Sequence, residues 1–285
     1  MKIPKRLQPL VDDGLIDAVI SRLMSGKEAD VFIVRCGDNI RCAKVYKDAM
    51  KRSFKKAAQY QEGKKVRSGR KARAMEKHSN YGRQQQEIIW QSAEVDALTL
   101  LASVGVRVPE TFCCVDGVLL MELVTDAAGD VAPRLGDVAL SEEQAIRDHT
   151  LMMHYIMLML CAGLVHGDLS EFNVLVDDHG PVIIDLPQAV NAASNNNAQA
   201  MFARDVNNMR RYYGAFAPAL LHTQYAKEMW ALFEEGDLTP GSTLTGEFED
   251  DSNSADVDAL LEEIEAVKQE EQERQAFINN AKEDE

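Results

Sequence analysis

The sequence predicts an α+β fold, because short strand pairs joined by polar turns are interspersed with longer stretches of helical spacing. Three strand pairs are predicted, within residues 31–46, 106–123 and 174–184. Apolar residues follow helical spacing in 7–24, 84–101, 202–216 and 226–233, and in the stretch after Ser141. Ser141 and Gln144 form the sequence pattern of a capping box, which marks the start of that helix.

In the N-terminal half, a helix is expected over residues 7–24, with Gly14 as its weak point. Two strands, 31–34 and 42–46, flank the Gly37-Asp38-Asn39 turn. A second helix is expected over 84–101. Two further strands follow it within 106–123 and flank an Asp-Gly turn, which is a strong hairpin signal.

In the C-terminal half, the helix after Ser141 is rich in methionine, which indicates core filler rather than a cofactor site. The short β-branched runs 174–176 and 182–184 flank a polar turn and predict a hairpin. Two amphipathic helices follow. From Gly241 the composition becomes acidic and polar, so a peripheral helix near 257–267 and a disordered end are expected.

The composition is that of a folded cytoplasmic protein. The chain has 285 residues, of which 46% are hydrophobic, and this is enough for one two-lobed domain or two small ones. Its five cysteines show no C-x-x-C spacing, which favours reduced thiols over a disulfide or zinc framework. The N-terminus lacks the apolar core of a signal peptide, and the longest apolar region, 151–165, is too short to span a bilayer.

Charge is strongly partitioned along the chain, although the net charge is −15. Residues 51–83 hold twelve basic and two acidic side chains, whereas residues 246–285 hold fifteen acidic and three basic ones. A basic, polar segment of this kind is either a flexible solvated loop or a nucleic-acid contact. Both alternatives stay open from the sequence.

The stretch 164–190 carries the strongest chemical signal, because three polar side chains meet at the ends of its strands. Asn173 precedes the first strand of the predicted hairpin, Asp185 follows the second, and Asp168 lies five residues before Asn173. Two oxygen ligands on adjacent strand ends suit Mg²⁺, which also takes phosphate oxygens and water. Asp168 would then orient or deprotonate an attacking hydroxyl. The alternative is that these residues are ordinary loop and turn-capping residues.

This arrangement resembles the protein-kinase pattern H-R-D-x-x-x-x-N followed by a metal-binding Asp. Two departures are clear, because Gly167 replaces the Arg and Leu186-Pro187 replaces Phe-Gly after the Asp. The motifs H-G-D-L-S-E-F-N and I-D-L-P-Q-A-V instead resemble those of the RIO family of atypical serine protein kinases, in particular its type-one-like, bacterial-style members. Aminoglycoside phosphotransferases also carry H-G-D-x-x-x-x-N, so the loop alone does not separate the two families.

Two basic residues in the N-terminal half fit the same reading. The turn of Ser25, Gly26 and Lys27 is not a Walker motif, but a small turn of this kind brings backbone N–H groups to phosphates. S-G-K-E-A-D-V-F resembles the phosphate loop of the RIO family. Lys44, in C-A-K-V-Y, occupies the place of the V-A-I-K lysine of kinases. The alternative is that Lys44 is an ordinary solvated lysine on a strand.

The resemblance also assigns the remaining site residues. It selects Glu94 as the helix glutamate that places Lys44, because RIO proteins carry a tryptophan four residues earlier, as Trp90 is here. It implies that the backbone of Glu122 and Val124 pairs with adenine. It further implies autophosphorylation in the basic loop, where the candidate serines are Ser53, Ser68 and Ser79.

The fold that the resemblance implies is protein-kinase-like, with a small β-rich N-terminal lobe over a larger helical lobe. Residues 1–125 would form the first lobe, with a flexible basic loop at 51–83, residues 126–240 the catalytic lobe, and residues 241–285 an acidic tail. ATP and Mg²⁺ (or Mn²⁺) are the expected cofactors. Asp205, in R-D-V-N-N, could brace the catalytic loop, although capping or a surface role is equally compatible.

Three activities are compatible with this reading. The first is a serine/threonine protein kinase that acts on a protein substrate or on itself. The second is an ATPase switch in ribosome assembly, in which Asp185 is transiently phosphorylated and the basic loop contacts ribosomal RNA or a pre-ribosomal particle. The third is a small-molecule kinase of the aminoglycoside type, which the basic loop and the RIO-like sequence motifs disfavour. A membrane partner is not expected.

Overall fold

A computed structural model describes residues 3–26, 28–47 and 93–248 of the chain. The N-terminal lobe is built on a five-stranded antiparallel sheet with the strand order β1-β2-β3-β5-β4. Its elements are α1 (Gln8–Asp12), β1 (Ala18–Ser25), β2 (Ala29–Cys36), β3 (Asn39–Tyr46), a helix over residues 93–103, β4 (Thr111–Val115) and β5 (Val118–Glu122). The two strand pairs predicted in this half are confirmed.

The helix predicted over 7–24 is wrong beyond Asp12. Helix α1 ends there, Gly14 takes the left-handed φ of 73°, and residues 18–25 form β1 instead. The register of β1 against β2 shifts twice, between Val19 and Ser21 and between Arg22 and Met24. These irregularities interrupt the two-residue alternation of a strand, so the apolar residues fall at a spacing that imitates a helix.

Strand β3 uses its two faces for different purposes, because successive side chains of a strand point to opposite sides of the sheet. Ala43 and Val45 join the buried cluster beneath α1. Lys44 and Tyr46 lie on the other face, where Tyr46 joins the main core together with Leu98 of the 93–103 helix. The strand therefore presents Lys44 to the space between the sheet, this helix and the second lobe.

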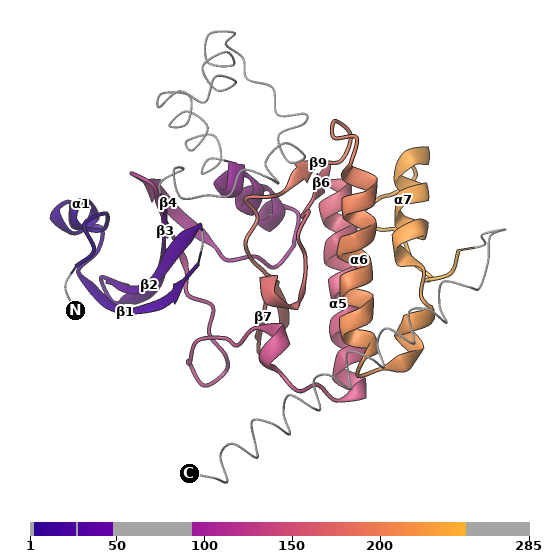
Figure 1. Cartoon of the computed structure of the whole chain (residues 1–285), viewed down its shortest axis with the longest axis horizontal. Coiled ribbons are helices and arrows are strands. Elements are labelled where there is room, and N and C mark those ends of the chain that lie inside the picture. Colours follow the sequence, from indigo (N-terminus) through magenta and orange to yellow (C-terminus); the bar gives the residue numbers. More distant parts are fainter. Residues whose placement is uncertain (1–2, 27, 48–92, 249–285) are drawn as a thin grey trace, which may run out of the picture.

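The second lobe is mainly helical, and α5, α6 and α7 stand side by side in it while the sheet lies at the opposite end of the molecule (Figure 1). The side chain of Ser141 accepts a hydrogen bond from the Gln144 N–H at 3.2 Å, which confirms the predicted start of α5. The elements are η3 (Leu135–Asp137), α5 (Glu142–Cys161), β6 (Leu164–Val165), η4 (Glu171–Asn173), β7 (Val174–Asp177), β8 (Gly180–Ile183), β9 (Val190–Asn191), α6 (Ala198–Gly214), η5 (Pro218–His222) and α7 (Tyr225–Glu235).

The predicted hairpin is confirmed as β7 and β8, which pair antiparallel with Val174 opposite Ile183. It lies between the sheet and the helices in Figure 1. The short strands β6 and β9 pair antiparallel on either side of it in the sequence. The segment from β6 to β9 therefore leaves the helical core, makes the loop and the hairpin, and returns to the core.

Several predictions fall outside the described residues. These are Lys27, the basic segment 51–83 with its three serines, the start of the 84–101 helix, the helix near 257–267 and most of the acidic segment. The domain boundaries after residues 125 and 240 stay a prediction. Within the ranges that the structure describes, no helix combines the length and the apolar character that crossing a membrane requires.

Candidate active site

Lys44 on β3 is held by two carboxylates that come from different lobes. Its Nζ lies 2.6 Å from Glu94 Oε1 and 2.7 Å from Asp185 Oδ1. Glu94 belongs to the helix of the N-terminal lobe, and Asp185 follows β8 in the second lobe. The Lys44 side chain is only 10% exposed. The structure thus brings together three residues that the sequence singles out and that are up to 141 positions apart.

The electrostatics of this cluster keep Lys44 and Asp185 ionised. Burial by itself lowers the pKa of Lys44, but the carboxylates of Glu94 and Asp185 outweigh burial, and the pKa of Lys44 is raised. Burial by itself raises the pKa of the Asp185 carboxyl, but Lys44, with a smaller contribution from Arg134, brings it below its ordinary value. Lys44 is therefore a cation, and Asp185 an anion, at neutral pH.

Tyr46 is a member of this cluster that sequence reasoning missed. Its hydroxyl donates a hydrogen bond to Glu94 Oε2, so Lys44 and Tyr46 each hold one oxygen of the same carboxylate. Burial, together with the adjacent Glu94, raises the pKa of Tyr46, which stays a neutral donor. The signal was available in the K-V-Y spacing, because residues two apart on a strand share a face.

The loop after β6 places Asp168 through bonds to its backbone. Gly167 has a φ of 82°, a left-handed conformation that strains an arginine, so the backbone explains why Gly stands where protein kinases carry Arg. On α6, Asp205 Oδ2 accepts the Gly167 N–H at 2.7 Å, and Oδ1 accepts the Leu169 N–H at 3.0 Å. The structure thereby selects the bracing role for Asp205 over a surface or capping role.

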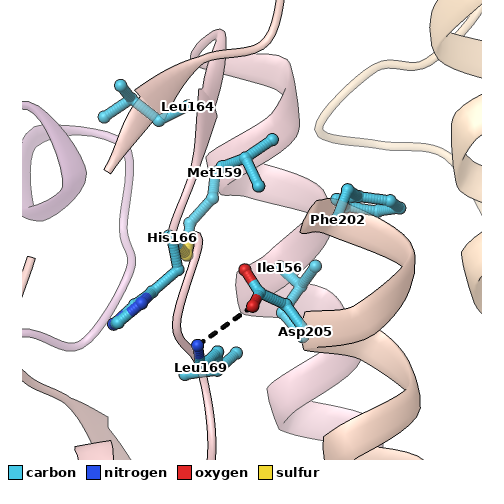
Figure 2. Close-up of a pocket in the computed structure, with 8 residues that line it drawn as sticks. Ile156, Met159, Leu164, His166, Leu169, Phe202 and Asp205 are labelled. Carbon is cyan, nitrogen blue, oxygen red and sulfur yellow. Dashed lines mark hydrogen bonds between the residues drawn. The ribbon is translucent and has the colours of Figure 1, made fainter. Parts of the chain in front are cut away.

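Figure 2 shows how α5 and α6 support this loop from behind. The carboxylate of Asp205 points toward the backbone N–H of Leu169, and both residues line a small cavity with mostly apolar walls. Burial raises the pKa of Asp205 to about 6, although both backbone N–H groups act in the opposite direction. The cavity is lined by Ile156, Met159, Leu164, Val165, His166, Leu169, Phe202 and Asp205. It lies between the loop and the helices and belongs to the support of the loop.

His166 joins the loop to the end of the hairpin. The Asp168 N–H lies 3.3 Å from His166 Nδ1, and His166 Nε2 lies 3.1 Å from the Ile184 carbonyl oxygen. Since a backbone N–H can only donate, Nδ1 is the acceptor, and Nε2 carries the proton that goes to Ile184. The neutral ring thus fixes Asp168 relative to the residue before Asp185.

Asn173 and Asp185 lie at the same end of the hairpin, as the sequence predicts. The Ile184 N–H donates to the Asn173 carbonyl oxygen at 3.0 Å, and Asn173 Nδ2 donates to the Asp168 carbonyl oxygen at 2.8 Å. Asp185 has a φ of 66°, a conformation that Asp tolerates better than most residues. This sharp turn after β8 directs its carboxylate toward Lys44, and the side chain remains 38% exposed.

The remaining sequence candidates have other contacts in the structure. The Ser25 hydroxyl donates to Asp30 Oδ1 at 2.5 Å, and the Lys47 ammonium lies 2.6 Å from the Gly26 carbonyl oxygen. The Val124 carbonyl oxygen accepts the Ala132 N–H at 3.0 Å. The phosphate contact predicted for Ser25 and the adenine contacts predicted for the backbone of Glu122 and Val124 stay predictions. Lys27 lies outside the described residues.

Arg107 makes a link between the lobes that the sequence did not reveal. Its guanidinium lies 2.6 and 2.8 Å from the two carboxylate oxygens of Glu122, at the end of β5, and 3.1 Å from Asp177 on β7. Its carbonyl oxygen accepts the Ile183 N–H at 3.0 Å. The Glu122 bond, more than the competing effect of burial, raises the pKa of Arg107. Arg107 thus ties the end of the sheet to both strands of the hairpin.

Comparisons with known proteins agree on one family. The RIO domain family matches residues 30–226. The Rio1 kinase of Haloferax volcanii is 33% identical over 207 residues, which cover 72% of this chain and 66% of that protein. The RIO1 kinase of Caenorhabditis elegans is 30% identical over 70% of this chain and 37% of its own length. The chain thus spans between about a third and two thirds of these relatives.

Solved structures show the same fold. A Rio2 kinase–ADP/Mg²⁺–phosphoaspartate complex from Chaetomium thermophilum aligns with a TM-score of 0.57 over 94% of this chain and 75% of its own, at 22% identity. A second structure of Rio2 kinase from the same organism aligns with a TM-score of 0.55 over 95% of this chain. The two-lobed, protein-kinase-like architecture is therefore established for this protein.

Proposed function

Because the chain belongs to the RIO family, we propose that it is an ATP-dependent serine/threonine kinase that transfers the γ-phosphoryl group of ATP to a hydroxyl group. The observation that carries the proposal is the Lys44 bridge to Glu94 and Asp185 across the two lobes. Phosphoryl transfer depends mainly on positioning and on charge neutralisation. A lysine that is fixed between a helix glutamate and a metal-binding aspartate is the part of a kinase site that provides both.

Asn173 and Asp185 would hold Mg²⁺ (or Mn²⁺), which would neutralise phosphate charge. The residues fit such an ion, because Lys44 binds Oδ1 of Asp185 and Asn173 uses its Nδ2 toward Asp168, so Oδ2 and the amide oxygen remain as ligands. Among the described residues, no cluster of three or more His, Cys, Asp or Glu side chains could hold a metal. Mg²⁺ does not need one, since phosphate oxygens and water complete its shell.

Asp168 would position the acceptor hydroxyl and take up its proton. Its backbone is fixed on three sides, by His166 at its N–H, by Asn173 at its carbonyl, and by Asp205 through the two neighbouring N–H groups. A backbone held in this way restricts where the Asp168 carboxylate can lie, so less entropy is lost when the acceptor binds. The acceptor is a protein substrate or the chain itself, with Ser53, Ser68 and Ser79 as the candidates in the basic segment.

A second candidate is an ATPase in which Asp185 is the acceptor. An oxygen of Asp185 would attack the γ-phosphorus, ADP would leave with the bonding electrons, and water would later hydrolyse the acyl phosphate. Two observations favour it: the 38% exposure of this carboxylate, and the phosphoaspartate in the related Rio2 complex. The basic segment supports a partner that carries phosphates, such as ribosomal RNA, and the cysteine usage supports a cytoplasmic location.

The test is incubation with γ-labelled ATP and Mg²⁺, followed by separation of labelled protein from free phosphate. Neutral hydroxylamine releases an aspartyl phosphate, whereas a phosphate ester on a serine or threonine hydroxyl survives it. Asp168→Asn should lower turnover by about a hundredfold or more while ATP binding is retained, because it removes a positioned catalytic group. Asp178→Asn, at the exposed turn between β7 and β8, is the matched control. Full turnover in Asp168→Asn would contradict the proposed function.

A further inference from the structure

The site has less positive charge available for a nucleotide than the presence of Lys44 suggests. Lys44 is already paired with Glu94 and Asp185, and Asp168, whose backbone is held by His166 and Asn173 at the end of the hairpin, adds a further carboxylate. The described cluster of these four residues is therefore net negative before any nucleotide is present. The phosphate chain of ATP adds about four negative charges, and one Mg²⁺ offsets only two of them. A further cation at the nucleotide would resolve this imbalance.

Arg134 lies at the right place in the second lobe. It is paired with Leu175 in an isolated antiparallel bridge, and the Val176 N–H donates to the Pro133 carbonyl oxygen at 2.9 Å. Its backbone therefore runs along β7, directly beyond Asn173. The following residue is also fixed, because the Tyr212 hydroxyl donates to the Leu135 carbonyl oxygen. The base of the Arg134 side chain is consequently held in one position.

The side chain of Arg134 reaches across to the first lobe without meeting a counter-ion. Its guanidinium lies 2.7 Å from the sulfur of Met24, which precedes Ser25 at the end of β1. A thioether is a weak acceptor that cannot balance a guanidinium charge. Among the residues that the structure describes, no carboxylate forms an ion pair with Arg134. Its charge nevertheless contributes to lowering the pKa of Asp185.

We propose that Arg134 is a nucleotide-binding residue that contacts the phosphate chain from the side of the second lobe. Its position between the end of β1 and Asp185 is where a phosphate chain held by Lys44 would pass. A guanidinium offers several N–H donors in one plane and binds phosphate oxygens with two of them at once. The contact with the Met24 sulfur is then a resting position, which the nucleotide replaces. This inference rests on the proposed function.

The experiment measures the Kd of Mg²⁺-ATP, Mg²⁺-ADP and adenosine by calorimetry. Arg134→Met removes the charge and keeps an unbranched side chain, and it should weaken ATP and ADP binding by about tenfold or more while adenosine binding stays unchanged. Arg134→Lys should lose less, because it retains the charge but not the planar pair of donors. Arg147→Met, an exposed position on α5, is the control for loss of a positive charge.

Met24→Leu tests whether the contact between Arg134 and Met24, which links the lobes, affects nucleotide binding. It removes the sulfur contact, keeps an apolar side chain, and should leave all three Kd values unchanged. Unchanged ATP binding in Arg134→Met, equal losses for ATP and adenosine, or an equal loss in Met24→Leu would each overturn the inference. Wild-type protein that binds no nucleotide would instead contradict the proposed function, so the two failures are distinguishable.

Discussion

At the scale of single residues, the carboxylate of Glu94 is the most constrained group in the site. Its two oxygens are divided between the ammonium of Lys44 and the hydroxyl of Tyr46, and its residue is only 1% exposed. Neither donor can be removed without leaving a buried oxygen unpaired, and such a loss is costly. Tyr46 therefore acts as a positioning residue for the Lys44–Glu94 pair.

Lys44→Met and Glu94→Gln should each lower kcat/KM for ATP by about a hundredfold, and the double variant should be little worse than either single variant, because the two residues act as one unit. Tyr46→Phe keeps the packing and removes only the hydroxyl, so it should cost less, about tenfold. Steady-state kinetics at varied ATP concentrations check the three values, with Lys227→Met on the exposed face of α7 as the control. Fully multiplicative losses in the double variant would show that the pair is not coupled.

At the scale of the elements, Arg107 decides how the sheet meets the hairpin. Asp177 is 4% exposed in its side chain, so Arg107→Met would leave a buried carboxylate without its cation. We expect a loss of about 1–3 kcal/mol in the free energy of unfolding, less than for a fully buried pair because Arg107 is 29% exposed. Urea unfolding measures it. If Arg107→Met/Asp177→Asn is no more stable than Arg107→Met alone, the unpaired carboxylate is not the cause.

Helix α5 carries a buried histidine, His149, whose protonation should lower the stability of the fold in acid. His149 is 1% exposed and packs against the rings of Tyr213 and Tyr225. Its Nε2 is one of the buried polar atoms that lack a partner among the described residues. Burial, together with the charge of Arg210, lowers the pKa of His149 from 6.5 to about 4. The folded protein therefore retains the neutral ring where an unfolded chain takes up a proton.

This proton uptake sets the direction in which the free energy of unfolding changes with pH. The stability from neutral His149 is fully present above pH 6.5 and is lost as the pH falls toward 4, by up to about 3 kcal/mol. Asp205 acts in the opposite direction, since its raised pKa favours the folded state at low pH. His149→Phe should flatten the slope of the unfolding free energy between pH 6.5 and 4.5, and exposed His154→Phe should leave it unchanged. An equal slope in all three proteins would contradict the assignment.

At the scale of the whole molecule, the two charged segments 51–83 and 246–285 carry opposite charge. The hypothesis is that the acidic segment competes in cis for the phosphate-bearing partner of the basic one. The structure decides where to cut the chain for a test. The Thr245 and Gly246 N–H groups donate to the Glu228 carboxylate on α7, at 2.7 and 2.8 Å, so a cut at Gly241 would remove contacts of the folded lobe. A cut after Phe248 keeps them.

The chain cut after Phe248 should bind RNA several-fold more tightly than the full chain at low salt. The gain should shrink as salt rises, because phosphate contacts weaken steeply and the Debye length is about 8 Å at physiological salt. Filter binding at two salt concentrations measures both effects. A further variant of the cut chain, in which Lys64, Lys65, Arg67 and Arg70 are changed to Gln, should lose the gain. Equal affinity of the full and the cut chain would leave the acidic segment a role in solubility alone.

The sequence alone predicted the elements whose signals are local. The strand pairs around the 37–39, 116–117 and 177–180 turns, and the start of α5 at Ser141, depend on turn chemistry, on capping and on apolar runs of a few residues. The site residues Asp168, Asn173 and Asp185 were found for the same reason, because a loop and a hairpin of fixed length bring them to one end. Family resemblance added Lys44 and Glu94, which lie far away in the chain.

Only the tertiary structure decided the contacts between segments that are distant in the sequence. The register of β1 against β2 turned an apparent helix into a strand, since bulges alter the spacing that periodicity reads. The pairs separated by between 15 and 110 residues are Tyr46 on Glu94, Asp205 under the loop that carries Asp168, and Arg107 and Arg134 with their partners between the lobes. Such pairs are fixed by how the sheet, hairpin and helices pack, and packing leaves no periodic trace in the chain.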